Sequence, residues 1–203
     1  MALIRLTVLV VLAAALIAAC GSGGGDIASS SAASAAPTAG IPAAFAWLHP
    51  APVTPAWTLV HVPGTATSVM AYPSSWRQIH SDPGTESAAR VGPGSELIAQ
   101  YLNATPQQGE ETLQNWSRFR PAHNVEEGDS HVQLLAAARG LRFRNGHGSC
   151  VIDRYRTPAT TYQEIACLVR GPHGGNVIVA TALAAQWAKD APALERAVSA
   201  FLA

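Results

Sequence analysis

The stretch CVIDRYRTPATTYQEIACLVR, residues 150–170, decides the fold. Its two halves, 150–156 and 161–170, are rich in Val, Ile, Tyr and Leu, which favour extended strands. The four residues between them include a proline and are too few for anything but a turn. The stretch therefore predicts a β-hairpin, and the rest of the domain can be built outward from it.

Folding this hairpin about its link places Cys150 opposite Cys167 and Asp153 opposite Glu164. Opposed residues in antiparallel strands have Cα atoms about 4.5–5.5 Å apart, which is a distance that a disulfide accepts. We expect a structural disulfide; a buried pair of free thiols or a redox site is the alternative, although no Cys-x-x-Cys motif is present. Two carboxylates facing each other are unfavourable unless both are solvated, so this acid pair counts against the register. The same register pairs Tyr155 with Tyr162.

The third cysteine, Cys20, ends an apolar leader. Arg5 supplies a positive end, residues 6–19 are almost wholly apolar, and two alanines precede the cysteine, as in a secretory signal peptide of about 15–30 residues. The segment resembles a lipobox, which implies cleavage after residue 19 and a diacylglyceryl group, with palmitate-type acyl chains, on Cys20. The alternatives are an ordinary signal peptide with a coincidental cysteine and an uncleaved anchor. The lipobox predicts a lipoprotein held on the extracytoplasmic face of the cell membrane.

Behind Cys20 the chain is a tether. Of residues 21–40, sixteen are Gly, Ser or Ala, so this segment has too little apolar surface to fold on its own. We therefore expect a signal peptide at 1–19, a lipidated cysteine and flexible tether at 20–40, and one globular domain at 41–203 with its core from about residue 57.

The formal net charge of zero argues against a nucleic-acid partner. The charges are unevenly distributed, however: residues 131–175 hold six arginines and two acids. This segment either neutralises the acidic segment 82–129 across the fold or forms a basic surface for anionic headgroups or an acidic partner. The candidates for such a surface are Arg142, Arg144, Arg154 and Arg156.

Hydrophobic patterns and turn residues predict a mostly antiparallel sheet with helices packed on it, an α+β domain. A helix is expected at 110–120, ended by Pro121, and a second one follows Asp190 as its N-cap. The expected strands are 57–62, 67–72, 87–91, 96–103, 131–138, 141–144, 150–156, 161–170 and 176–184, with turns at Pro63-Gly64, Gly92-Pro93-Gly94 and Asn145-Gly146.

The segment Ala71-Tyr-Pro-Ser-Ser-Trp76, which closes the first hairpin, resembles the opening of the PsbP and Mog superfamily. The middle helix, the long antiparallel meander and the closing amphipathic helix are similar to that family over residues 57–203. The resemblance implies a non-enzymatic binding or assembly factor. The metal-binding positions of its photosynthetic members have no counterpart here.

No motif identifies a reaction. Ser130 stands in Gly128-Asp-Ser-His-Val132, where a nucleophile elbow needs a second glycine in place of Val132. The segment Gly146-His-Gly-Ser149 lacks the final glycine and the helix of a dinucleotide site. No histidines have metal-ligand spacing, although His123, His131 and His147 could still converge in space. We therefore expect no catalytic residue, no metal and no cofactor.

Five tryptophans suggest packing or ligand contact, and Trp47 and Trp187 are the candidates for an exposed contact. The main hypothesis is a membrane-anchored, non-catalytic binding or assembly module of the cell envelope, with an envelope protein as partner. The alternatives are a carrier of a small apolar or lipid ligand, held between sheet and helix, and a hydrolase built around Ser130.

Overall fold

The computed structural model describes residues 40–92 and 97–203. The predicted signal peptide, Cys20 and the tether as far as residue 39 lie outside the described residues, as do Pro93 and Gly94 of one predicted turn. Within the described ranges, no helix is both long and apolar enough to cross a bilayer.

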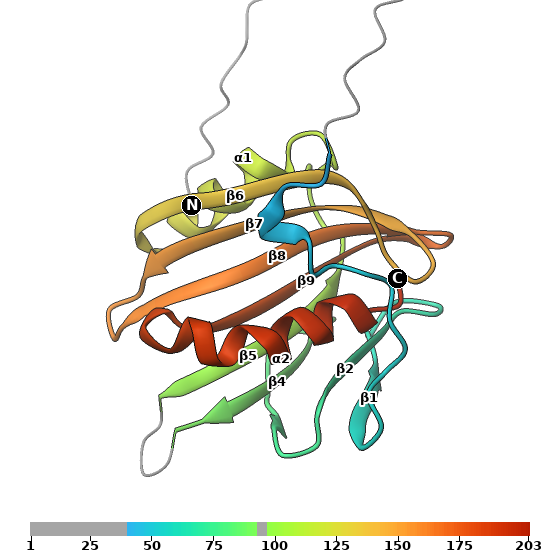
Figure 1. Cartoon of the computed structure of the whole chain (residues 1–203), viewed down its shortest axis with the longest axis horizontal. Coiled ribbons are helices and arrows are strands. Elements are labelled where there is room, and N and C mark those ends of the chain that lie inside the picture. The colour runs from blue at the N-terminus through green and yellow to red at the C-terminus, as the bar shows by residue number, and fades with distance from the viewer. Residues whose placement is uncertain (1–39, 93–96) are drawn as a thin grey trace, which may run out of the picture. The chain divides into compact units, whose positions relative to one another are not determined.

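Most of the described strands form one antiparallel sheet of seven strands, in the order β3-β4-β5-β9-β8-β7-β6 (Figure 1). A separate antiparallel pair, β1 (Trp57–His61) with β2 (Val69–Pro73), packs beside it, and β2 also bridges to Leu202 near the end of the chain. The strands of the large sheet are β3 (Arg77–Gln78), β4 (Glu86–Val91), β5 (Ile98–Pro106), β6 (Ser130–Arg142), β7 (His147–Arg156), β8 (Thr161–Gly171) and β9 (Gly174–Leu183).

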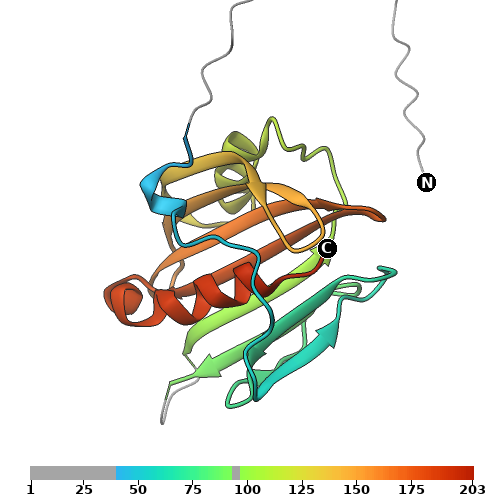
Figure 2. The same ribbon diagram turned by 45° about the vertical axis from the view of Figure 1, so that its right-hand side comes forward.

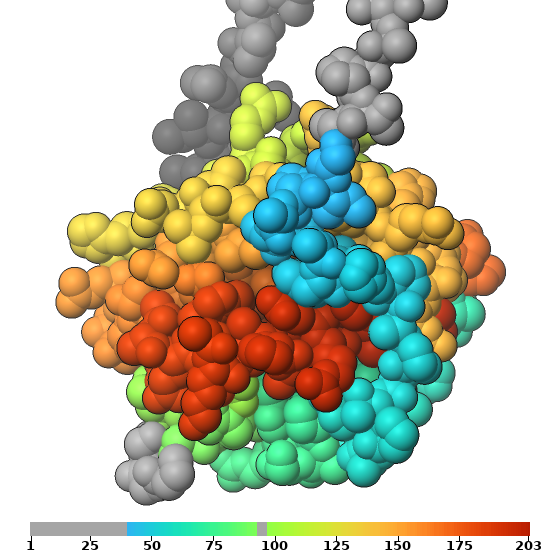
Figure 3. Space-filling view, in the orientation of Figure 1, coloured from blue at the N-terminus to red at the C-terminus, as the bar shows by residue number. Residues whose placement is uncertain are grey.

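One face of the large sheet carries helix α2 (Trp187–Ala200), which follows the short helix η2 (Ala184–Gln186). Helix α2 crosses in front of the sheet in Figures 1 and 2, and the chain that leads through η1 (Ala43–Phe45) to β1 crosses the same side. Together these segments cover the middle of this face (Figure 3). Beneath them lies the main apolar core, whose fully buried side chains include Phe45, Met70, Leu102, Ile165, Ile178, Leu194 and Phe201.

The opposite face of the sheet carries helix α1 (Trp116–Glu126), which packs on β6 and β7. Its apolar contact is small: Trp116 packs with Val151, Ala166, Leu168 and Val179, and its indole N–H donates to the carbonyl oxygen of Ala166 at 2.9 Å. The predicted α+β class, a mostly antiparallel sheet with helices packed on it, is confirmed.

The hairpin of residues 150–170 has the predicted register, with Cys150 opposite Cys167 and Asp153 opposite Glu164. The two cysteines form a disulfide, with a Cα–Cα distance of 4.1 Å, and both are buried. The acid pair, which counted against this register, is present in it although neither acid is solvated: Asp153 and Glu164 are both 0% exposed. Helix α1 covers them and supplies the polar partners described below.

The predicted middle helix is displaced by about half its length. Residues before 116 form a turn instead, in which Thr112 N–H donates to Asn115 Oδ1 at 2.6 Å and Asn115 N–H donates to Thr112 Oγ1 at 3.1 Å. Pro121 lies inside α1 and does not end it. A proline inside a helix removes one backbone hydrogen bond and costs about 3 kcal/mol, and the packing of α1 on the sheet offsets this cost.

Two further boundaries differ from the prediction. The strands expected at 131–138 and 141–144 are one irregular strand, β6, whose register shifts let it follow β7 throughout. Asp190 is not an N-cap, because α2 begins three residues earlier at Trp187. Instead, Asp190 is buried in the first turn of α2 and pairs with the Arg90 guanidinium at 3.1 Å.

Candidate functional site

A cluster of buried charges lies between α1 and the sheet. Arg120, four residues after Trp116 on the same helix face, donates from Nε and Nη2 to the two carboxylate oxygens of Glu164 at 2.7 and 3.0 Å. One turn later, the Asn124 amide lies 3.4 Å from Asp153 Oδ2 and 3.5 Å from Glu164 Oε1. The acid pair of the hairpin is therefore the docking point of α1.

Three titratable groups in this cluster have displaced pKa values. Burial, followed by the nearby Glu164 carboxylate, raises the pKa of Asp153 from 3.8 to about 8, although Arg120 acts in the opposite direction. Burial alone would lower the pKa of Arg120, but the Glu164 carboxylate outweighs it and raises that pKa. Burial and Glu164 also raise the pKa of Tyr155. Asp153 therefore keeps its proton to a higher pH than an ordinary aspartate does, and its Oδ1 has no hydrogen-bond partner.

Beside this cluster, α1 leaves part of the sheet uncovered, and a groove of about 540 Å³ opens there. Volumes of roughly 300–1,000 Å³ are typical of small-molecule sites. The floor of the groove is the α1-side face of β5 and β9, one wall is α1, and loops before β4 and after β5 complete it. Four aromatic side chains line it: Tyr101, Trp116, Phe119 and Tyr155.

The groove runs along β5 and β9, because the paired residues of these strands form its floor. Tyr101 stands opposite Thr181, and Thr105 stands opposite Val177. Four residues of strand separate the two pairs, which corresponds to about 13 Å at roughly 3.3 Å per residue. The end at Thr181 also holds Tyr155 and Arg120, whereas the end beyond Thr105 meets the loop that contains Glu111.

Two buried polar side chains line the groove without full hydrogen bonding. Glu111 is 5% exposed; its Oε1 accepts the Gln108 backbone N–H at 2.9 Å, while its Oε2 has no partner. The Thr181 hydroxyl, near that of Tyr155, makes no hydrogen bond of normal geometry. A buried polar atom without a partner costs about 1–3 kcal/mol, so a new hydrogen bond to either atom would be stabilising.

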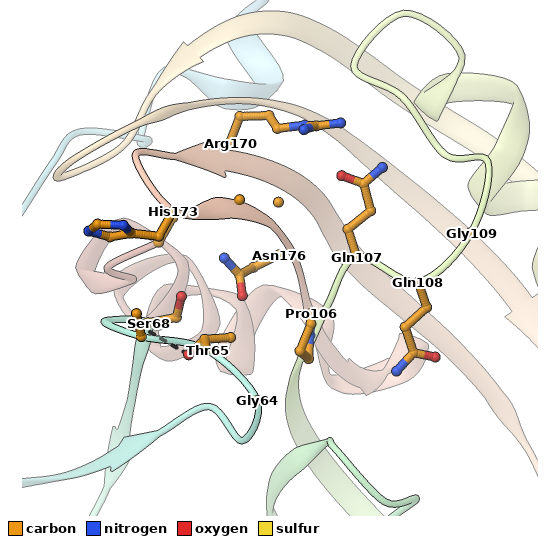
Figure 4. A pocket seen from close by; sticks show the side chains of 14 residues that line it. Gly64, Thr65, Ser68, Pro106, Gln107, Gln108, Gly109, Arg170, His173 and Asn176 are labelled. Carbon is orange, nitrogen blue, oxygen red and sulfur yellow. Dashed lines mark hydrogen bonds between the residues drawn. The ribbon is translucent and has the colours of Figure 1, made fainter.

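A second cavity, of about 610 Å³, lies on the other side of the loop that follows β5 (Figure 4). Pro106, Gln108 and Gly109 line both cavities, so this loop separates them. Arg170 and His173 are exposed at the second cavity, and the buried Asn176 Oδ1 has no partner. No aromatic side chain other than the His173 imidazole lines this cavity, which makes the α1 groove the stronger candidate.

The four arginines predicted to form a basic surface are placed in two pairs. Arg142 and Arg144 lie at the start of β7, where Arg142 is opposite His147, whereas Arg154 and Arg156 lie at its end. Arg144 contacts the carbonyl oxygen of Ala200 at 3.4 Å, and Arg154 donates to Gln163 at 2.9 Å. The structure does not bring the four together, and their anionic contact stays a prediction.

Ser130 and the three histidines do not form a site. The Ser130 hydroxyl donates to the carbonyl oxygen of Arg156 at 3.2 Å instead of to an imidazole. His131 and His147 lie at opposite ends of the β6–β7 pair, and His123 stacks on Phe119 in α1. In the described ranges, no three His, Cys, Asp or Glu side chains are grouped as metal ligands.

The two tryptophans expected to be exposed contacts pack against the main core instead. Trp47 and Trp187 are both partly buried there. Their apolar rings complete the α2 face, which is why neither is left for a partner.

The residues of the groove are not predicted by the sequence, because they come from separate elements. One signal was present: an acid pair in a hairpin that is otherwise apolar requires a cation or a proton. Arg120 is spaced to share a helix face with Trp116 and Asn124. Glu111 and Thr181 gave no such signal, since only the fold brings their strand and loop together.

No protein-family model matches the chain, and no curated protein sequence is significantly similar to it. Three solved structures have a similar arrangement. PA94 from Pseudomonas aeruginosa, a protein of unknown function, is 11% identical with a TM-score of 0.47, over 72% of this chain and 96% of its own. Cyanobacterial PsbP (CyanoP) from Synechocystis is 14% identical with a TM-score of 0.46, over 66% and 85% of the two chains.

LpqN, involved in cell envelope biogenesis of Mycobacterium tuberculosis, is 14% identical with a TM-score of 0.44, over 71% of this chain and 88% of its own. A PsbP-like arrangement is thus found among the similar structures. None of these similarities is strong enough to place the chain in a family.

Proposed function

We propose that this protein is a lipid-anchored, extracytoplasmic binding module and that the α1 groove is its ligand site. The observation that carries the proposal is the groove itself: about 540 Å³ of space, four aromatic side chains, and two buried polar side chains with unpartnered oxygens. Aromatic side chains beside a few polar atoms that lack partners are features of small-molecule sites, and the rest of this lining is more polar than is usual for them.

The anchor rests on the sequence of the leader, with cleavage after residue 19, lipid on Cys20, and a tether to residue 40. Because a linker rich in Gly, Ser and Ala is expected to behave as a flexible chain, membrane association would depend on the lipid and not on the folded domain. Replacing Cys20 with Ala should move the protein from the membrane fraction to the soluble fraction, with its circular dichroism spectrum unchanged. A variant that stays with the membrane after leader cleavage contradicts the anchor.

The binding role is supported by how the groove residues are held. Arg120 is fixed by Glu164, and Trp116 is fixed by Ala166, so the groove is formed before any ligand arrives. Charged and hydroxyl side chains among its lining favour a ligand with polar groups over the lipid tail considered above.

The site is tested by filling it. Asn103 lies on the groove floor, so Asn103→Trp places an indole where the ligand would bind. Leu135→Trp is the matched control, because Leu135 is 41% exposed on the edge strand and does not line the groove. Both variants and the parent chain, purified in detergent, are screened by thermal shift against a library of small metabolites. Compounds that raise the melting temperature of the parent and of Leu135→Trp, but not of Asn103→Trp, support the proposal.

The opposite pattern contradicts it. If every stabilising compound acts equally on Asn103→Trp, the ligand site lies elsewhere in the protein. If no compound stabilises the parent chain, the groove is not a small-molecule site, and cross-linking in membranes would then identify the envelope partner of an assembly module.

A further inference from the structure

The charges of the groove are unbalanced. Three acids line it, Asp82, Glu111 and Glu127, against a single arginine, Arg120. Arg120 is already bound by Glu164 at 2.7 Å and approached by Glu127 at 3.8 Å. Its positive charge is therefore neutralised within the protein and is not free for an anionic ligand.

Two of the three acids lack a cation. Glu127 is also contacted by His123, at 3.3 Å, so that acid has partners. Across residues 40–92 and 97–203, no cationic side chain lies within ion-pairing distance of Glu111 or Asp82. Asp82 is exposed at the mouth, where water solvates it, but Glu111 is 5% exposed and its Oε2 has neither an ion pair nor a hydrogen bond.

A buried carboxylate oxygen of this kind is stabilised by a donor that carries a positive charge. The loop around it holds Glu111 in place: Gln108 N–H bonds its other oxygen, and the Gln107 side chain bonds its backbone carbonyl. Gly109 keeps the near side open, since a Cβ there would lie 2.7 Å from Glu111 Oε2. The carboxylate is thus held in place at the groove, with its Oε2 buried and unpaired.

The aromatic lining favours the same ligand charge. A cation placed over the face of a Tyr, Phe or Trp ring is attracted by the negative face of the ring, and four such rings line this groove. Between the Glu111 end and the Thr181 end, the floor and walls include Val177, Val179 and Phe119, which suit an apolar body.

We infer that the α1 groove takes a small organic cation: an ammonium group bound at Glu111 and an apolar or aromatic body lying along β5 and β9 toward Thr181. This inference rests on the proposed function and names the ligand class of the same site.

The test uses three probes that share one ring system and differ only at the end group. Tryptamine carries an ammonium group, tryptophol a hydroxyl, and indole-3-acetate a carboxylate. Dissociation constants are measured by isothermal titration calorimetry with the full chain in detergent micelles, and Asn103→Trp in the same micelles serves as the blank for detergent partitioning. Since a charged hydrogen bond changes affinity by about ten-fold or more, tryptamine should bind at least that much more tightly than tryptophol, and indole-3-acetate should bind most weakly.

The role of Glu111 is tested with two variants. Glu111→Gln keeps a side-chain oxygen for the Gln108 N–H but removes the charge, so it should weaken tryptamine binding about ten-fold and leave tryptophol binding unchanged. Glu126→Gln is the matched control: it also removes one acid, from the 76% exposed side chain on α1 that does not line the groove, and it should change neither constant.

The outcomes separate this inference from the proposed function. If tryptophol or indole-3-acetate binds as tightly as tryptamine, or if Glu111→Gln leaves tryptamine binding intact, the cationic ligand class is wrong. The groove remains the site in those cases as long as Asn103→Trp abolishes the binding. If Asn103→Trp binds all probes like the parent chain, the groove itself is wrong. If tryptamine does not bind at all, the cationic ligand class is also wrong. The metabolite screen then tests independently whether the groove is the ligand site.

Discussion

The two faces of the large sheet are stabilised in different ways. The α2 face is apolar and closed: Leu194, Val198 and Phe201 pack on the strands, and the disulfide lies within the same core. The α1 face is held by one tryptophan and a buried cluster of charges, and part of it is left open. Both faces belong to the same strands, because alternate residues of β7 and β8 point to opposite sides.

This difference separates stability from function within one sheet. An apolar contact is not directional and fills all the space available, so the α2 face has no room for a ligand. A charge cluster fixes α1 at a point, through Arg120 and Glu164, and leaves the adjacent β5 and β9 surface uncovered. The groove exists because α1 is docked by polar contacts near one side of the sheet.

The largest effect is expected from breaking that docking point. Arg120→Met keeps the length of the side chain but leaves Glu164 and Asp153 buried without a cation, which should lower the free energy of unfolding by about 3–5 kcal/mol. Urea denaturation followed by circular dichroism measures the loss. Arg118→Met, at an exposed position on the same helix, is the control and should change stability by less than about 0.5 kcal/mol. A loss below about 1 kcal/mol in Arg120→Met would show that the ion pair does not hold α1.

The α2 face should respond to loss of apolar volume instead. Leu194 is 0% exposed, and Leu194→Ala should lower the free energy of unfolding by about 2–5 kcal/mol. Arg196→Ala, two residues later on the solvent side of α2, is the control. A loss in Leu194→Ala no larger than that in Arg196→Ala would contradict the apolar stabilisation of this face.

Much of the α2 face could be predicted from the sequence. The hairpin register, the cysteine pair and the helical spacing of Leu194 and Val198 all follow from local patterns and turn residues. These features depend on interactions between neighbours in the sequence or across a short turn, so period and spacing reveal them.

The α1 face could not be predicted in the same way. The helix was expected at 110–120 because two acids there look like a helix start and Pro121 like a stop, yet Glu111 instead bonds the backbone of its own loop. The acid pair counted against the hairpin register because nothing in the hairpin itself neutralises it. Its partner, Arg120, is more than 30 residues away along the chain, and only tertiary packing brings the two together.

The smallest change in any single step of measurement, at most about 1.4 kcal/mol per pH unit, is also the most specific to the α1 face, because it concerns one proton. The pKa of Asp153 is about 8 in the folded protein against an ordinary value of 3.8, so between these values the folded state keeps a proton that the unfolded chain releases. The stability associated with Asp153 is therefore fully present below about pH 4 and is lost as the pH rises toward 8, by at most about 1.4 kcal/mol per pH unit. Asp153→Asn cannot titrate and should escape this loss.

The free energy of unfolding of Asp153→Asn should therefore rise relative to that of the parent chain at each step from pH 5 to pH 7. Above about pH 8 the difference between the two proteins should become constant. Urea denaturation of both proteins at four pH values measures this, and the remaining acids cancel in the difference because both proteins carry them. Glu126→Gln removes an exposed acid from α1. Its free energy of unfolding should change with pH in the same way as that of the parent chain. Parallel curves for Asp153→Asn would mean that Asp153 is ionised in the folded protein. Arg120 would then have to neutralise two carboxylates at once. The charge cluster would therefore stabilise the docking of α1 by less than the loss of about 3–5 kcal/mol expected for Arg120→Met.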